Sequence, residues 1–96
     1  MPRPVTLSMV NVTARLEGID QRRRELLALV DRAGSAGAQI VLLPECCDHH
    51  RTHEALAAHA TGSADELHRV CGLMLSSPWM RALADLAVKH RMVVIP

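Results

Sequence analysis

Ile40 to Leu43 read IVLL, four consecutive apolar residues with no polar alternation. A strand with one face in water alternates apolar and polar side chains, whereas a strand covered on both faces reads as a continuous apolar run. Such runs are typical of parallel strands in the layers of α/β proteins. We therefore expect residues 39–43 to form a parallel strand with both faces covered.

The segments before this strand fit the same class. Residues 5–12 (VTLSMVNV) are rich in β-branched side chains and alternate in part, which predicts a first strand. Residues 20–36 change to a helical period. Gly34 weakens this helix and Gly37 ends it, because glycine is unfavourable inside a helix and favoured just beyond its end. The expected buried stripe of the helix consists of Ile19, Leu26, Val30, Ala33 and Gly37.

The second half of the chain predicts three more helices and a strand. Residues 53–75 read as two short helices with a break at residues 61–63. Ser77 is placed to cap a further helix that starts at Pro78 and ends near His90, and residues 92–95 predict an apolar strand. The apolar positions expected are Leu67, Val70, Cys71 and Met74 before the cap, and Trp79, Leu83, Leu86 and Ala87 after it.

The order of these elements, β-α-β-(α)-α-β, indicates an α/β fold. The last residues, MVVIP, carry no turn, helix cap or polar tail. We therefore expect the sequence to be cut through a larger sheet, so that the domain is incomplete in this chain.

Composition narrows the classes of function. Of 96 residues, 49% are apolar and 22% are charged, which is typical of one folded domain. A net charge of +1 and the absence of Tyr and Phe argue against nucleic-acid binding. No stretch approaches the roughly 20 apolar residues of a membrane span, and no signal peptide or paired cysteine framework is evident. We expect a cytoplasmic protein with reduced thiols.

Glu45 is the strongest candidate for chemistry, because it directly follows an apolar strand. In open α/β sheets, ligands and reacting groups gather beyond the carboxyl ends of the strands. Pro44 keeps Leu43 extended and fixes its own φ, so the carboxylate leaves the strand in a defined direction. The placement predicts a positioned acid or base.

The run AGSAGAQIVLLPE, which ends at Glu45, resembles the nitrilase superfamily of carbon–nitrogen hydrolases. VTLSMVNV is similar to the family's first strand, and LADLAVKHRMVVI to its next helix and strand. The resemblance implies a four-layer α-β-β-α sandwich, of which residues 1–96 form a partial, N-terminal portion. It also implies hydrolysis of amide, nitrile, urea or carbamoyl compounds by a Glu-Lys-Cys triad, and we expect no cofactor and no metal ion.

In that triad the cysteine attacks the substrate carbon, the lysine stabilises the charged intermediate, and the glutamate moves protons. Glu45 matches the family glutamate. Lys89 precedes the third strand where the family lysine follows it, and Cys46, Cys47 and Cys71 do not match the nucleophile. The resemblance therefore implies a chain that is inactive alone and whose complete protein takes a small amide or nitrile.

A cluster of thiols and imidazoles after Glu45 offers a third interpretation, ranked last, a small zinc- or copper-binding protein. Both metals prefer these ligands. The spacings match neither C-x-x-C nor H-E-x-x-H, so a polar loop near a pocket mouth is the favoured interpretation. The cluster consists of Cys46, Cys47, His49, His50 and His53.

Two further groups receive structural interpretations. Cys71 lies on an apolar helical stripe, which predicts that it is a small core residue. Cys46 is not expected to be a catalytic thiol, because no partner base stands at a recognisable spacing from it. Arg22, Arg23 and Arg24 span too much of a helix circumference to form one binding patch, which predicts a solvated face.

The second interpretation, ranked above the metal site, is a degenerate or interaction module that docks onto a full-length relative through its apolar sheet. The second and third strands are apolar on both faces, so a face without helices needs a cover. We therefore expect a homo-oligomer, or another association through an exposed apolar face, with no nucleic acid and no membrane as partner.

Overall fold

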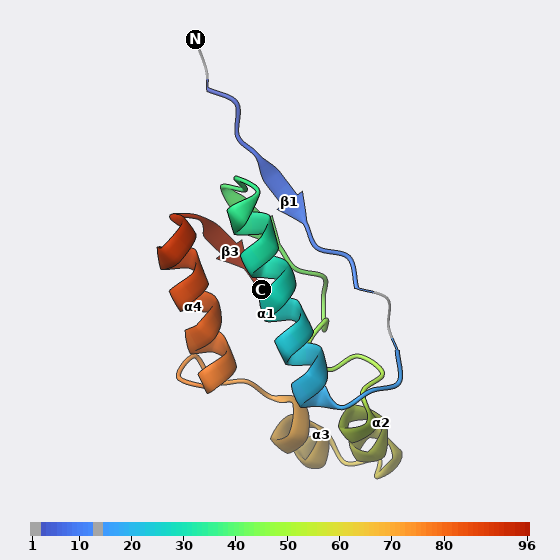
Figure 1. The fold of residues 1–96 in the computed structure, drawn as a ribbon. Helices are drawn as coiled ribbons and strands as arrows, with labels where there is room; N and C mark the ends of the chain where they lie inside the picture. Colours follow the sequence, from blue (N-terminus) through green and yellow to red (C-terminus); the bar gives the residue numbers. More distant parts are fainter. Residues whose placement is uncertain (1–2, 13–14) are drawn as a thin grey trace.

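The computed structural model describes residues 3–12 and 15–96, and they form an α/β structure with a small parallel sheet. Two long helices lie against one face of the sheet, and two short helices lie together at its carboxyl end (Figure 1). The elements in chain order are β1 (Leu7–Met9), α1 (Ile19–Ser35), β2 (Ile40–Leu42), α2 (His53–Ala60), α3 (Ala64–Cys71), α4 (Pro78–His90) and β3 (Val93–Ile95).

The three strands pair in the order β1-β2-β3, and both pairs are parallel. The prediction of a parallel strand around Val41 is thus confirmed, and the structure places this strand in the centre of the sheet. Across the sheet, Ser8 lies beside Val41 and Val41 beside Val94, and this row faces the helices. The strands are shorter than predicted, because pairing covers three residues of each.

The core lies between the sheet and the pair α1 and α4. Leu26 and Val30 of α1 and Val41 of β2 are fully buried, and Leu83 of α4 belongs to the same core cluster. Trp79 is buried in the same cluster, and its indole Nε1–H donates to the backbone oxygen of Arg23 at 2.9 Å. The predicted stripes of both helices are therefore confirmed at their central positions.

The opposite face of the sheet carries no helix in the described part of the chain. The prediction that both faces of the central strand are covered is therefore wrong for these residues. Each connection steps to the next strand in the same direction, so α1 and α4 fall on one side of the sheet. We call the uncovered side the open face; its residues are Leu7, Met9, Ile40, Leu42, Val93 and Ile95.

Local sequence signals fix most helix ends. The Ser77 side chain accepts from the backbone N–H of Met80, as predicted, and Pro78 is the first helical residue. Thr52 and Ser63 cap α2 and α3 in the same way. Among residues 3–12 and 15–96, no helix is long and apolar enough to cross a membrane.

The predicted apolar stripe of α3 extends one turn too far. The helix ends at Cys71, and Met74 lies exposed in the connection to α4. Gly72 has an extended backbone, and the residues after it do not return to the helix. The helical spacing of the apolar residues did not predict that α3 ends at Cys71.

Gly34 brings α1 and α4 into close contact. A Cβ at this position would lie 2.4 Å from Cγ and Cδ2 of His90. From this place the His90 ring reaches Asp31, with Nε2 2.6 Å from its Oδ1, and the Lys89 Nζ lies 3.0 Å from the same oxygen. Gly34, which looked like a weak point of the helix, is therefore a packing requirement.

We predict that Gly34→Ala destabilises the chain, although alanine is the better helix former by about 1 kcal/mol. The methyl group meets the His90 ring, and overpacking of this kind costs about 1–3 kcal/mol. In a His90→Ala background the same change should stabilise instead. Urea unfolding followed by the fluorescence of Trp79 measures both, and a Gly34→Ala effect of the same sign in the two backgrounds would contradict the contact.

Candidate functional site

Glu45 lies where the sequence predicts it, just beyond the carboxyl end of the central strand. The backbone N–H of Leu43 donates to the carbonyl oxygen of Ile95 at 2.9 Å, so regular pairing with β3 reaches the residue before Pro44. Glu45 then opens the turn that leads to α2, and its side chain is exposed. We call residues 43–52 the β2–α2 loop.

The β2–α2 loop is tightly coiled. Cys46 and Arg51 have positive φ values of 54° and 61°, a region that costs residues other than glycine some free energy. The backbone N–H of His50 donates to Cys46 O at 2.9 Å, and that of Thr52 donates to His49 O at 3.0 Å. A residue other than glycine keeps a positive φ only where contacts with the surrounding structure stabilise it.

Arg22 supplies that support, and it is the residue that the sequence analysis misplaced. The prediction of a solvated face for Arg22 to Arg24 is wrong at Arg22, whose side chain is 1% exposed. Its Nη1 donates to the carbonyl oxygens of Cys47 at 3.1 Å and His50 at 2.9 Å. Two contacts of one guanidinium group thus fix the loop from inside.

The same guanidinium holds the chain segment before α1. Its Nε donates to Oε1 of Glu17 at 2.5 Å, and its Nη2 donates to the carbonyl oxygen of Arg15 at 2.9 Å. The charge can be buried because each nitrogen of Arg22 has a partner. The Arg22 hydrogen bond is also the main cause that holds the pKa of Glu17 below its usual value.

The next arginine contacts the loop from a half-buried position. Arg23 Nη2 lies 3.1 Å from Oδ2 of Asp48, and the other oxygen of that buried carboxylate lies 3.1 Å from Nδ1 of His49. Arg24 is exposed, as predicted. Of these three arginines, Arg22 and Arg23 contact the loop and Arg24 is in solvent.

The first residues of α2, which follow the loop, contact the start of α1. Gly18 precedes that helix and offers no side-chain cap, but the Glu54 carboxylate of α2 accepts from the backbone N–H of Ile19. The backbone N–H of His53 donates to Glu17 O at 2.9 Å. A capping carboxylate at a helix N-terminus is favourable, so α2 and α1 stabilise each other.

The three cysteines differ in environment. Cys46 is exposed, whereas Cys47 and Cys71 are buried, which confirms Cys71 as a core residue. Burial raises the pKa of the Cys47 thiol to about 11, and the neighbouring Asp48 carboxylate adds to the rise. Burial also raises the pKa of Cys71. Both shifts disfavour the thiolate, which is the nucleophilic form of cysteine.

The predicted metal-site alternative gains no support from this geometry. Within the described ranges, no group of three or more His, Cys, Asp and Glu side chains could hold a metal ion. Cys47 points into the core while Cys46 is exposed, so the two neighbours do not share one site. The imidazole of His49 is engaged by Asp48 instead.

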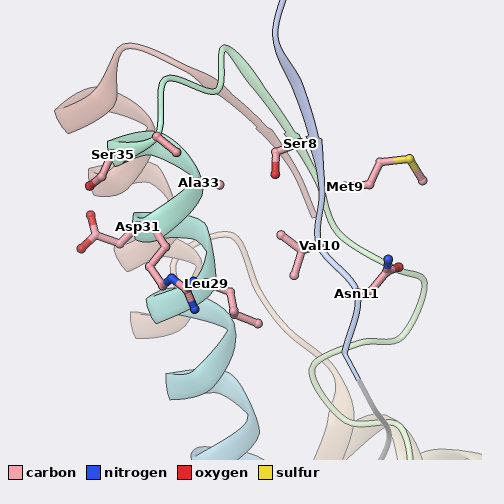
Figure 2. A pocket seen from close by; sticks show the side chains of 10 residues that line it. Ser8, Met9, Val10, Asn11, Leu29, Asp31, Ala33 and Ser35 are labelled. Atoms are coloured by element: carbon pink, nitrogen blue, oxygen red, sulfur yellow. The ribbon is translucent and has the colours of Figure 1, made fainter.

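Glu45 does not line any of the surface hollows described for residues 3–12 and 15–96. The largest, of about 650 Å³, lies between β1 and the end of α1, where Ser8, Val10 and Asp31 are among its lining residues (Figure 2). A smaller hollow of about 300 Å³ lies between the β2–α2 loop and α3, against His49.

Lys89 does not approach Glu45. It lies in the last turn of α4, which ends where β3 begins, at the amino edge of the sheet, and its Nζ is bound to Asp31. Glu45 lies at the carboxyl edge. Of the residue types expected in a Glu-Lys-Cys site, the described residues therefore bring only Glu45 and the neighbouring Cys46 to one place.

In comparisons with known proteins, no family model, no curated protein and no solved structure matches this chain.

We predict that Arg22→Met lowers the free energy of unfolding by about 3–5 kcal/mol, the usual effect of removing one partner of a buried ion pair. Arg24→Met, on the exposed side of the same helix, should change it by no more than about 0.5 kcal/mol. Urea titration with circular dichroism measures both variants. Equal effects would show that the guanidinium of Arg22 does not hold the loop.

We also predict that only one thiol reacts readily in the folded chain. At pH 8, Cys46 should react with a thiol reagent at least ~100-fold faster than Cys47, whose raised pKa leaves almost no thiolate. The fast phase should vanish in Cys46→Ser and persist in Cys47→Ser. In denaturing urea all three cysteines should react alike, and a fast phase that survives Cys46→Ser would contradict the assignment.

Proposed function

We propose that this chain carries the acid/base glutamate of a carbon–nitrogen hydrolase. The observation that carries the proposal is the position of Glu45, an exposed carboxylate at the carboxyl end of the central parallel strand. Reacting groups of open α/β sheets gather at this edge. The resemblance of AGSAGAQIVLLPE to the nitrilase superfamily assigns the same residue its chemistry.

Support also comes from how firmly the position is held. A general base acts well only when its carboxylate returns to the same place in each reaction cycle. The backbone on either side of Glu45 is held, because Leu43 pairs with β3 and the carbonyl oxygens of Cys47 and His50 accept from the Arg22 guanidinium. Loops that carry function are placed by such rigid surroundings.

The proposed role of Glu45 is to accept a proton from an attacking thiol or water and return it to the leaving amine. The substrates are small amides, nitriles, ureas or carbamoyl compounds. A lysine and a cysteine from outside the described residues would complete the site, and a second sheet would complete the four-layer sandwich. We place this activity in the cytosol, in keeping with the free thiols of the chain.

A second candidate function is a docking module, and a specific observation favours it. The open face presents six apolar side chains without a cover in the described residues. A contiguous patch of this kind marks an interaction surface in proteins that remain folded.

The hydrolase proposal is tested with the 96-residue chain and with the full product of its gene. The chain alone should turn over no amide, nitrile or carbamoyl substrate. The gene product should hydrolyse at least one of them, and Glu45→Gln should lower its kcat at least ~100-fold, which is typical of losing a general base. Asp65→Asn, a change of an exposed carboxylate on α3, is the matched control and should be neutral.

Three outcomes contradict the proposal. One is a gene product with no lysine and cysteine beyond this chain. Another is full activity in the Glu45→Gln variant. The third is turnover by the 96 residues alone that depends on Glu45, which would mean that the catalytic set lies within them.

A further inference from the structure

The outer edge of β1 has no partner strand in the described part of the chain. On the inner edge, the carbonyl oxygen of Thr6 and the N–H of Val10 bond to β2, at 2.9 and 3.0 Å. The backbone groups of a strand alternate between its two edges, so those of Leu7 and Met9 turn outward. Residues 5–12 contain no proline and no charge, two features that keep an edge from pairing. The outer edge is therefore open to a further strand.

The largest hollow described, of about 650 Å³, lies along β1 and has α1 as its other wall (Figure 2). Met9 and Asn11 line this groove although their side chains point away from α1, so it is their backbone that borders it. The other edge strand, β3, lines none of the hollows described. Extended peptides bind proteins by adding a strand at a free sheet edge. The groove leaves room beside β1 for such a strand and its side chains.

The wall formed by α1 selects the side chain that fits between the helix and an added strand. Leu29 and Ala33 make part of this wall apolar, and the exposed Arg32 lines it as well. Arg32 forms no ion pair with the described residues, whereas Asp31 beside it is bound by two side chains of α4. The groove thus keeps one free cation. A glutamate matches it, with its methylene groups against the apolar wall and its carboxylate toward the guanidinium.

The other side of an added strand lies next to Leu7 and Met9, which are 56% and 65% exposed. Apolar side chains fit there, because neighbouring strands pair side chains of like character. We propose that β1 binds an extended peptide of another protein as an added strand, in which apolar residues alternate with glutamates. The glutamates face Arg32, and the apolar residues lie beside Leu7 and Met9. This inference does not rest on the hydrolase proposal, because it uses only the edge of β1 and the groove along it.

Isothermal titration calorimetry on the 96-residue chain tests the proposal, in about 0.15 M salt to screen distant charges. The probe is the peptide Val-Glu-Val-Glu-Val, acetylated and amidated at its ends, and it should bind. The matched peptide Val-Lys-Val-Lys-Val should bind at least ~5-fold more weakly, because its lysines meet a like charge. Arg32→Glu should reverse this preference. Arg81→Glu, which changes an exposed arginine of α4 outside the groove, is the matched control and should leave both affinities unchanged.

The backbone pairing is tested on the peptide, which avoids a variant that fails to fold. One version of the glutamate peptide is N-methylated at every valine, and another at every glutamate. The N–H groups of a strand alternate between its edges, so only one of the two sets can pair with β1. One version should therefore lose binding while the other keeps it.

The proposal is overturned if the glutamate peptide does not bind, or if its two N-methylated versions behave alike. It is also overturned if Arg32→Glu and Arg81→Glu change the preference between the peptides equally. Binding by the 96 residues but not by the full product of the gene would assign the groove to the protein's own chain, and has the same meaning. Circular dichroism on both variants establishes that any change in affinity arises from folded protein.

Discussion

The structure depends on one buried guanidinium group. Arg22 points from the first turns of α1 into a space between the segment before the helix and the loop after β2. It donates to three carbonyl oxygens and to the carboxylate of Glu17. A buried charge is tolerated only when it is paired and its hydrogen bonds are made, so the buried position of Arg22 depends on these partners.

The buried guanidinium of Arg22 also stabilises the loop that carries Glu45. The β2–α2 loop includes two residues with positive φ, and the contacts of Arg22 and Arg23 compensate for that strained backbone. The loop also sets where α2 begins, and α2 returns Glu54 to the N-terminus of α1. Glu45 is therefore exposed on a loop whose later residues, Cys47 to His50, are held by Arg22 and Arg23.

The open face of the sheet, by contrast, has no layer packed against it in the described residues. With the strands in the order β1-β2-β3, both long helices lie over the row that contains Val41. The other side has no comparable layer among residues 3–12 and 15–96. The described layer is one parallel sheet with helices on one side, and both functions proposed for the chain, hydrolase domain and docking module, place a second surface against the other side.

The sequence by itself determined the elements and many of their ends. The helical period of the apolar residues predicted α1, and Ser77 with Pro78 predicted the start of α4. The apolar run around Val41 predicted a parallel strand with Glu45 just beyond its end. These signals are local, since caps and periods act over three or four residues. Only the tertiary structure decided that Arg22 is buried, that α3 stops before Met74, and which residues of the sheet the helices leave uncovered. Each of these depends on contacts between distant parts of the chain, such as Arg22 with His50. No local pattern encodes such a contact, because an exposed arginine and a buried one with four partners look the same in a helix sequence.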